Sequence, residues 1–339
     1  MHSQEEKINY MLSVPQIGNT SSFKGLKIAV LQPDYSTSNV DYQHYDPKRD
    51  LSLIMPEATI DHIFLNKLTT YQQLKELKEK QYDIYINLCE GYLEWEVPSI
   101  DVIMSLDLLE LPYTGPSANL YDPPKTTMKY LAFCEDVKTP AHMLIESEAA
   151  MAELPGNLSF PLFVKPAKAG DSLGVDNASK VNNLDELKTK VKSILDGFGT
   201  ALVEEYIDGR EFTVLVCANA DGKTCTSFVP VEYIFPKGFS FKTYALKTSE
   251  LHPNANIAVS DIHLAKRLQT MAEQIFLSFS GVGYARMDFR MNKNEEIFFL
   301  EINFTCSVFY AQGYEGSADY ILLHDPAGQR GFLERIIIE

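Results

Sequence analysis

Four polar side chains near the carboxyl end of the chain have the types and spacing of a cation site. They lie on two apolar runs, GYARMDFRM and EIFFLEINF, which read as a hairpin that turns at residues 292–295. Side chains alternate across a strand, so pairing Met291 with Glu296 puts all four on one face. The four are Arg286, Asp288, Glu301 and Asn303.

Two carboxylates and an amide oxygen favour a hard cation. Mg²⁺ prefers oxygen ligands and completes its shell with water and phosphate, and Mn²⁺ takes similar ligands. A salt bridge between Arg286 and Glu301 on a solvated face is the alternative that these four residues leave open. The metal interpretation also predicts phosphate-binding residues elsewhere in the chain.

One candidate phosphate-binding segment lies upstream. Lys165 ends the apolar run PLFVK, and the loop AKAGDSLGV after it contains Gly170, Ser172 and Gly174. Glycines let backbone N–H groups approach an anion closely. The loop has neither the Walker nor the dinucleotide-binding pattern, so a plain hairpin turn remains the alternative.

Two further segments have residues suited to a nucleotide. In LVEEYIDGREF, a strand edge with Glu204, Glu205 and Glu211 can receive an adenine amino group and ribose hydroxyls, although an exposed acidic turn has the same composition. Lys247 lies in FKTYALKTSE, a polar segment able to fold over a ligand. A solvated lysine is the alternative there.

The elements that position these residues follow an α/β order. Residues 1–23 are polar and aperiodic and read as a mobile arm, and residues 24–119 alternate strands with helices. A second unit from residue 120 opens with a helix and continues with two strands around the glycine loop. NLDELKTKVKSILDGFG is then expected as a helix that ends at a glycine, and ALVEEYIDG as the next strand. From REFTVLVCA onward the chain is β-rich, and one helix is expected in it, at SDIHLAKRLQTMAEQIFLSF.

In order and spacing, the segments KPAKAGDSLG, LVEEYIDGREF, YALK, RMD and LEIN resemble the ATP-grasp superfamily, and within it the D-alanine–D-alanine ligase branch. The resemblance implies a three-lobed α/β fold that begins with a parallel α/β domain. The implied parts are an amino-terminal substrate domain, a central lobe and a carboxy-terminal lobe with the metal site, over residues 24–119, 120–207 and 208–339.

The resemblance also implies roles for matching positions. The metal ligands would be Asp288, Glu301 and Asn303, and the catalytic residues Arg286, Lys247 and Ser172. The nucleotide contacts would be Lys125, Lys165, Gly170, Glu204, Glu205, Ile207, Glu211 and Lys247.

The implied reaction joins a small carboxylate to an amine at the expense of ATP. The carboxylate takes the γ-phosphoryl group to form an acyl phosphate and ADP, and the amine then displaces phosphate. Magnesium is the implied cofactor. A homodimer is suggested by the resemblance alone.

Both substrate regions depart from that family. The first βα loop, LQPDYSTSNVDYQHYDP, lacks the EVS stretch whose glutamate holds the first substrate's ammonium group. After Asn303, FTCSVFYAQGYEGSAD stands where the family has TSPGMT, and Ser317 is the residue there that can grip the second substrate. Asp171 in the glycine loop leaves one alternative open, an ATP-binding regulatory protein without turnover. A kinase that stops at the acyl phosphate is a further alternative.

Composition limits the partners. A net charge of −16 disfavours binding to nucleic acid or to an anionic membrane through the overall field. The five cysteines have no CxxC spacing, which favours reduced thiols. With no secretory pattern at the amino end and no run of about 20 apolar residues, a cytoplasmic location is expected.

Overall fold

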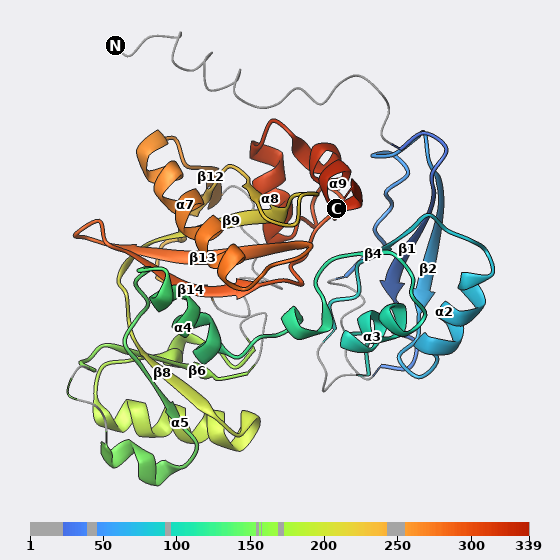
Figure 1. Cartoon of the computed structure of the whole chain (residues 1–339). Coiled ribbons are helices and arrows are strands. Elements are labelled where there is room, and N and C mark those ends of the chain that lie inside the picture. The colour runs from blue at the N-terminus through green and yellow to red at the C-terminus, as the bar shows by residue number, and fades with distance from the viewer. Residues whose placement is uncertain are drawn as a thin grey trace, which may run out of the picture.

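The computed structural model describes residues 23–38, 46–91, 96–153, 156, 158–168, 173–242 and 255–338. Within this part of the chain, three sheets define three lobes, one beside another in Figure 1. The predicted α/β, three-lobed architecture is confirmed. Among the described residues, no helix is long and apolar enough to cross a membrane.

The amino-terminal domain is a parallel sheet in the order β2-β1-β3-β4. Helices α2 and α3 cover one face of it (Figure 1). Ala29 and Leu31 of β1 pack against these helices, whereas Ile28 and Val30 point to the opposite face. The elements are β1 (Lys27–Pro33), β2 (Thr59–Leu65), α2 (Thr70–Lys78), β3 (Ile84–Asn87), α3 (Ile100–Leu108) and β4 (Tyr113–Thr114).

That opposite face is covered by the carboxy-terminal lobe. Ile28 and Val30 belong to the same core as Phe228 and Phe332, so the two units share apolar packing. Phe23 is fully buried in this core as well. The predicted arm included residue 23, but burial of this aromatic ring removes apolar area from water and starts the packed domain there.

The central lobe is an antiparallel sheet in the order β5-β8-β6-β7, backed by α5. Helix α5 begins where the Asn183 side chain accepts two backbone N–H bonds, and it ends at Gly199, whose φ is +79°. The elements are β5 (His142–Ile145), η2 (Glu148–Glu153), β6 (Leu162–Pro166), η3 (Asn177–Ser179), β7 (Lys180–Val181), α5 (Leu184–Phe198) and β8 (Ala201–Glu205).

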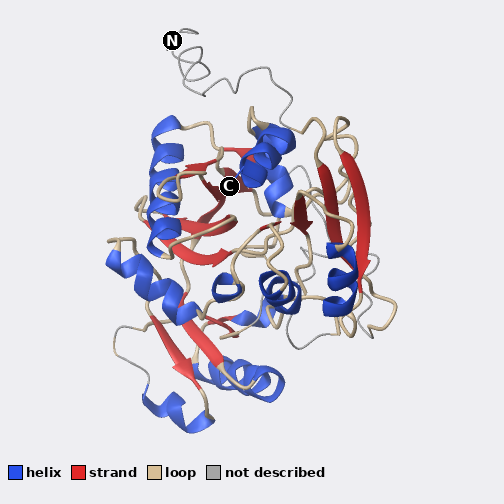
Figure 2. Cartoon of the chain, turned by 45° about the vertical axis from the view of Figure 1, so that its right-hand side comes forward, coloured by secondary structure: helices blue, strands red, loops and turns tan. Residues whose placement is uncertain are grey.

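The carboxy-terminal lobe is a larger sheet in the order β12-β11-β9-β13-β14, with β10 on β9. Figure 2 shows its strands and the covering helices beside the separate amino-terminal sheet. The elements are β9 (Gly209–Ala218), β10 (Cys225–Ser227), β11 (Val231–Tyr233), β12 (Asn256–Ala258), α7 (Ile262–Ser278), β13 (Tyr284–Asn292), β14 (Ile297–Asn303), α8 (Ser317–His324) and α9 (Gly328–Ile338).

Two details differ from the expected organisation. One helix was expected after residue 208, but α8 and α9 follow α7; α9 ends in three isoleucines, and β-branched residues favour strands in a sequence-based prediction. Helix α4 (Lys125–Cys134), preceded by η1 (Ala118–Leu120), was assigned to the central lobe. Its buried residues Met128 and Ala132 instead pack in the core of the carboxy-terminal lobe.

Candidate active site

The site is built on the hairpin of β13 and β14, whose register contains a bulge. Asp288 lies directly opposite Glu301, and the register then shifts so that Met291 faces Ile297 rather than Glu296. The expected pairing of Met291 was therefore wrong. The shift leaves Leu300 of β14 without a cross-strand partner, as a β-bulge does. Because of this extra residue, Glu301 lies on the same face of the hairpin as Asp288.

The facing carboxylates have unequal surroundings. Oδ2 of Asp288 lies 3.0 Å from a guanidinium nitrogen of Arg286, whereas its Oδ1 is buried with no hydrogen-bond partner among the described residues. Arg286 also donates to the hydroxyl of Ser317 at the start of α8. Oε2 of Glu301 lies 3.6 Å from Nζ of Lys125.

These residues fit a magnesium ion. The described residues contain no group of three or more His, Cys, Asp and Glu side chains that could hold a metal ion. The candidate ligand set is therefore two carboxylates, from Asp288 and Glu301, and the amide oxygen of Asn303. Mg²⁺ is commonly held by one or two carboxylates together with phosphate oxygens and water. Oδ1 of Asp288, which accepts no hydrogen bond from the described residues, could coordinate such an ion. Oδ1 of Asn303 already accepts the Thr305 N–H at 2.8 Å.

A pocket between the central and carboxy-terminal lobes brings the predicted lysines and carboxylates together. Its charged lining consists of three lysines and three carboxylates, and its apolar lining includes Phe163 and Phe241, whose ring centroids are 5.0 Å apart. The lining residues are Lys125, Phe163, Lys165, Pro166, Leu173, Val175, Glu211, Phe241, Lys242, Asp288, Leu300 and Glu301.

Glu204 holds two lysines of this region by ion pairs. Its Oε2 lies 2.8 Å from Nζ of Lys165, and its Oε1 contacts Nζ of Lys129. Burial alone would raise the pKa of Glu204, but the two ammonium groups outweigh burial and lower that pKa to about 2. The same pairing overcomes burial at Lys165 and raises its pKa. Lys165 is therefore a fixed positive charge on the pocket wall.

Glu211 is also held by two cations. Its Oε1 lies 3.2 Å from Nζ of Lys242, and its Oε2 lies 3.5 Å from Nε of Arg290. Arg290 further donates to the carbonyl oxygen of Ile207 at 2.8 Å. These contacts fix Glu211, near the start of β9, in the lining of the pocket.

The structure places the predicted residues in different settings. Lys125, Lys165, Glu211, Asp288 and Glu301 line the one pocket, and Arg286 and Asn303 face each other beside it. Glu204 does not line the pocket, and the side chain of Glu205 is exposed while its N–H donates to the carbonyl of Ala141. Gly170, Ser172 and Lys247 lie outside the described residues.

Several residues of the site were not predicted. Lys129 lies one helical turn after Lys125, and this spacing of four residues is a sequence signal for a shared face of α4. Lys242 and the aromatic pair of Phe163 and Phe241 belong to segments far apart in the chain, and no local pattern marks them.

Comparison with known proteins identifies the class. The chain has the ATP-grasp fold: the D-Ala:D-Ser ligase VanG of Enterococcus faecalis superposes on 93% of it with a TM-score of 0.66, at 18% identity and over 99% of that chain. A Bacillus anthracis D-alanine–D-alanine ligase complexed with ATP superposes with a TM-score of 0.62, at 18% identity, over 93% of this chain and 96% of that one.

The sequence then identifies the family. Residues 130–309 match the family model described as D-ala D-ala ligase C-terminus, and the chain belongs to this family. A D-alanine–D-alanine ligase of Aquifex aeolicus is 31% identical over 200 residues, which is 58% of this chain and 64% of that protein. One from Enterococcus faecalis is 29% identical over 213 residues, 58% of each chain. These matches span about three fifths of the relatives' length.

Proposed function

We propose that this protein is an ATP-dependent, ADP-forming carboxylate–amine ligase. The observation that carries the proposal is the pair of facing carboxylates, Asp288 and Glu301, in one pocket with Lys125 and Lys165. Membership of the D-alanine–D-alanine ligase family supports the same activity. Asp171, the feature that leaves regulatory ATP binding open, lies outside the described residues.

The proposed reaction has two steps. An oxygen of the substrate carboxylate bonds to the γ-phosphorus of ATP as the bond to the β-phosphate oxygen breaks, which gives an acyl phosphate and ADP. The amine nitrogen then bonds to the acyl carbon, phosphate leaves, and the amine loses a proton. Both steps build negative charge on oxygen atoms, so fixed cations accelerate them.

The chain's own residues would divide this work. Lys125 and Lys165 would bind phosphate oxygens or the base, with Lys165 kept charged and fixed by Glu204. Arg286, fixed by Asp288 and Ser317, would steady the oxyanion at the reacting carbonyl. The adenine would lie near the strand end at Glu205 and Ile207. Gly170, Ser172 and Lys247 keep the roles that the resemblance implies.

Asp288 and Glu301, with Asn303, would hold magnesium. The bound ion would supply positive charge next to the transferring phosphoryl group. Mn²⁺ would be accepted by the same oxygen ligands. Asn303 would take part only if its amide oxygen turned away from Thr305.

The substrates we propose are small amino acids. The relatives are named for D-alanine and D-serine substrates, and the loop from residue 304 to 316 has its own sequence here. We therefore expect the amine to come from an amino acid. A screen would identify which two amino acids the protein joins. A homodimer is carried over from the resemblance, and sedimentation of the purified chain tests it. A cytoplasmic location is carried over from the sequence pattern.

The test is release of ADP and phosphate from ATP and Mg²⁺, screened over pairs of amino acids. We expect turnover for at least one pair, and we expect Glu301→Gln to lower kcat/KM by about 100-fold or more, since it removes charge at the transferring group. Glu296→Gln, on the same hairpin but outside the pocket, serves as the matched control.

Two results would contradict the proposal. One is ATP binding without turnover for any carboxylate and amine. The other is a folded Glu301→Gln variant as active as Glu296→Gln. Hydroxamate formed with hydroxylamine, with no amide product in its absence, would instead identify a kinase that stops at the acyl phosphate.

A further inference from the structure

The segment between β14 and α8, residues 304–316, begins and ends beside the proposed reaction site, and we call it the connecting loop. It follows Asn303, a candidate metal ligand, and precedes Ser317, the first residue of α8. The hydroxyl of Ser317 accepts a hydrogen bond from Arg286 of β13. The conformation of the connecting loop therefore sets where α8 begins beside Arg286.

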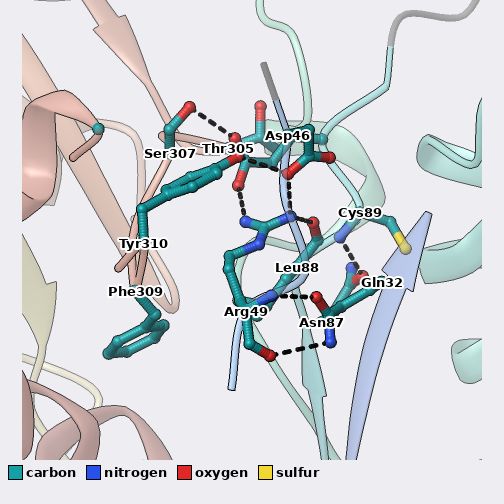
Figure 3. Close-up of polar contacts among 12 residues, drawn as sticks. Gln32, Asp46, Arg49, Asn87, Leu88, Cys89, Thr305, Ser307, Phe309 and Tyr310 are labelled. Carbon is teal, nitrogen blue, oxygen red and sulfur yellow. Dashed lines mark hydrogen bonds and ion pairs between the residues drawn. The ribbon is translucent and has the colours of Figure 1, made fainter. Parts of the chain in front are cut away.

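The middle of the connecting loop contacts the amino-terminal domain (Figure 3). Ser307 donates to Oε2 of Glu90 at 3.0 Å, and Tyr310 donates to Oδ1 of Asp46 at 2.7 Å. The guanidinium of Arg49, a buried side chain of the amino-terminal domain, lies 4.7 Å from the centre of the Tyr310 ring. The connecting loop is thus held at its middle as well as at its two ends.

The carboxylate of Asp319, in the first turn of α8, accepts four hydrogen bonds. Its Oδ1 accepts from the backbone N–H of Phe309 at 2.7 Å and from Nε2 of Gln329 at 2.8 Å. Its Oδ2 accepts from the backbone N–H of Tyr310 at 3.1 Å and from that of Gly316 at 3.0 Å. A carboxylate oxygen accepts two bonds, so these four donors occupy the whole carboxylate. Three of the four belong to the connecting loop.

Asp319 is a buried carboxylate that is surrounded by neutral donors. Only 1% of the residue is exposed. Burial raises the pKa of Asp319 to about 6, although all four hydrogen bonds oppose that rise. A buried carboxylate is unfavourable unless it is hydrogen-bonded, and here the connecting loop supplies most of the bonds. The connecting loop and the carboxylate therefore depend on each other.

Two positions of the connecting loop need this support. Phe309 has a φ of +67°, in the left-handed region that a residue other than glycine rarely adopts. A Cβ atom on Gly316 would lie 2.6 Å from the carbonyl oxygen of Ser307, so the two arms of the loop approach closely there. Phe309 and Gly316 both donate their N–H groups to Asp319. The carboxylate thus holds the loop in a conformation that local geometry alone does not favour.

We propose that Asp319 is a positioning residue for the ligation reaction and acts on Arg286 through Ser317. This inference rests on the proposed function and adds a residue outside the described lining of the nucleotide pocket. Gly316 is the N-cap residue of α8, so the bond from its N–H to Asp319 fixes the start of the helix. Ser317 and Asp288 then hold two nitrogens of the Arg286 guanidinium, which stays in place for the reacting oxyanion.

Asp319→Asn tests this role with little change in size. An amide has one oxygen that accepts and one nitrogen that donates, so two of the four donors would lose their acceptor. For an amino-acid pair that gives turnover, we expect kcat to fall about 10-fold or more, while KM for ATP changes less than about 2-fold. Asp325→Asn, just after α8, is the matched control, because Asp325 also accepts backbone N–H bonds, from Val229 and Ala327. Its kcat should change less than about 2-fold.

A double-substitution cycle separates positioning from a merely structural role. If Asp319 acts through Ser317, Asp319→Asn should lower kcat by less than about 2-fold once Ser317→Ala is present. A folded Asp319→Asn variant with unchanged kcat overturns the inference, as does an equal loss of kcat in both backgrounds. If Asp319→Asn does not fold, Gln329→Leu removes one donor instead: a loss of kcat that disappears in the Ser317→Ala background supports the inference, and any other result overturns it.

The NMR signal of the Arg286 Nε–H group, assigned by its loss in Arg286→Lys, keeps this test apart from the proposed function. We expect Asp319→Asn to shift or broaden the signal and Asp325→Asn to leave it in place. Such a shift without turnover for any amino-acid pair would overturn the ligase activity and leave the action of Asp319 on Arg286 standing. An Arg286 signal that is identical in wild type and both variants overturns the role of Asp319, whatever the activity.

Discussion

At the scale of single residues, the electrostatics of the pocket depend on Glu204. This carboxylate is buried, and its charge is balanced by Lys129 and Lys165. With one ammonium group on each of its oxygens, this carboxylate keeps both lysines in place. The three groups together carry a net positive charge. Under the proposed function, phosphate oxygens in the pocket would meet Lys165 as a cation that is already in place.

We predict that Glu204→Gln destabilises the fold by about 3–5 kcal/mol, because loss of one partner leaves buried charge uncompensated. Urea denaturation of the variant beside Glu205→Gln measures the difference. Glu205 is the adjacent residue with an exposed side chain, so its substitution should change the free energy of unfolding by less than about 0.5 kcal/mol. Equal stability of the two variants would show that the ion pairs of Glu204 contribute nothing to the free energy of unfolding.

The pKa of Glu204 also predicts a pH dependence of stability. The folded state lowers this pKa from its ordinary value of 4.5 to about 2, so the unfolded chain binds the proton more tightly. The contribution of Glu204 to stability is complete above pH 4.5 and is lost as pH falls toward 2. The free energy of unfolding, measured between pH 6 and pH 3, should fall more steeply for the wild type than for Glu204→Gln. If the free energies of the two proteins fall in parallel with pH, Glu204 does not contribute in this way.

At the scale of elements, strand geometry decides which side chains meet. The bulge at Leu300 keeps Glu301 opposite Asp288, and β9 runs beside β13 so that Glu211 pairs with Arg290. Gly209 starts β9 at a position where a Cβ atom would lie 2.1 Å from the carbonyl oxygen of Met291. Its φ is +147°. The turn that carries Glu211 therefore depends on a glycine.

We predict that Gly209→Ala destabilises the protein by about 2–4 kcal/mol and weakens nucleotide binding, because strand β9 must move away from β13. Gly222→Ala is the matched control, since Gly222 also has positive φ but has open space around its Cβ position. Thermal unfolding and nucleotide affinity measure both effects. If Gly222→Ala loses as much stability and nucleotide affinity as Gly209→Ala, the effect is due to backbone strain alone.

At the scale of the whole molecule, the amino-terminal domain and the carboxy-terminal lobe are joined by a common core. Alternate residues of β1 face that core, where Phe228 and Phe332 pack with them. Arg330 of α9 adds an ion pair to Glu57, at 2.9 Å. Gly283 approaches Gly115 so closely that a Cβ on Gly283 would lie 2.3 Å from the Gly115 carbonyl oxygen.

We predict that Gly283→Ala separates the two units and lowers stability by about 2–5 kcal/mol, through backbone strain and overlap with Gly115. Gly115→Ala is the control, because Gly115 also has positive φ but its own Cβ position is open. It should cost about 1–3 kcal/mol. Calorimetric unfolding should remain a single transition for Gly115→Ala and split in two for Gly283→Ala. Identical behaviour would exclude the close approach as the cause.

The sequence by itself determined the local parts of the site. Alternation along two strands put Asp288, Glu301, Asn303 and Arg286 on one face, and the order of short motifs identified the fold. These features depend on neighbours within one hairpin or on residues in series. Periodicity and spacing describe such relations directly.

Only the tertiary structure decided how distant segments meet. It joined Glu204 to Lys129 and Lys165, set Lys242 against Glu211, and brought Glu90 to Ser307 across two lobes. Burial and opposite charge set these pairings, and both depend on packing between elements rather than on any local pattern. The bulge at Leu300 was not predicted either, because a shift of one residue leaves the apolar pattern along a strand unchanged while it changes every cross-strand partner.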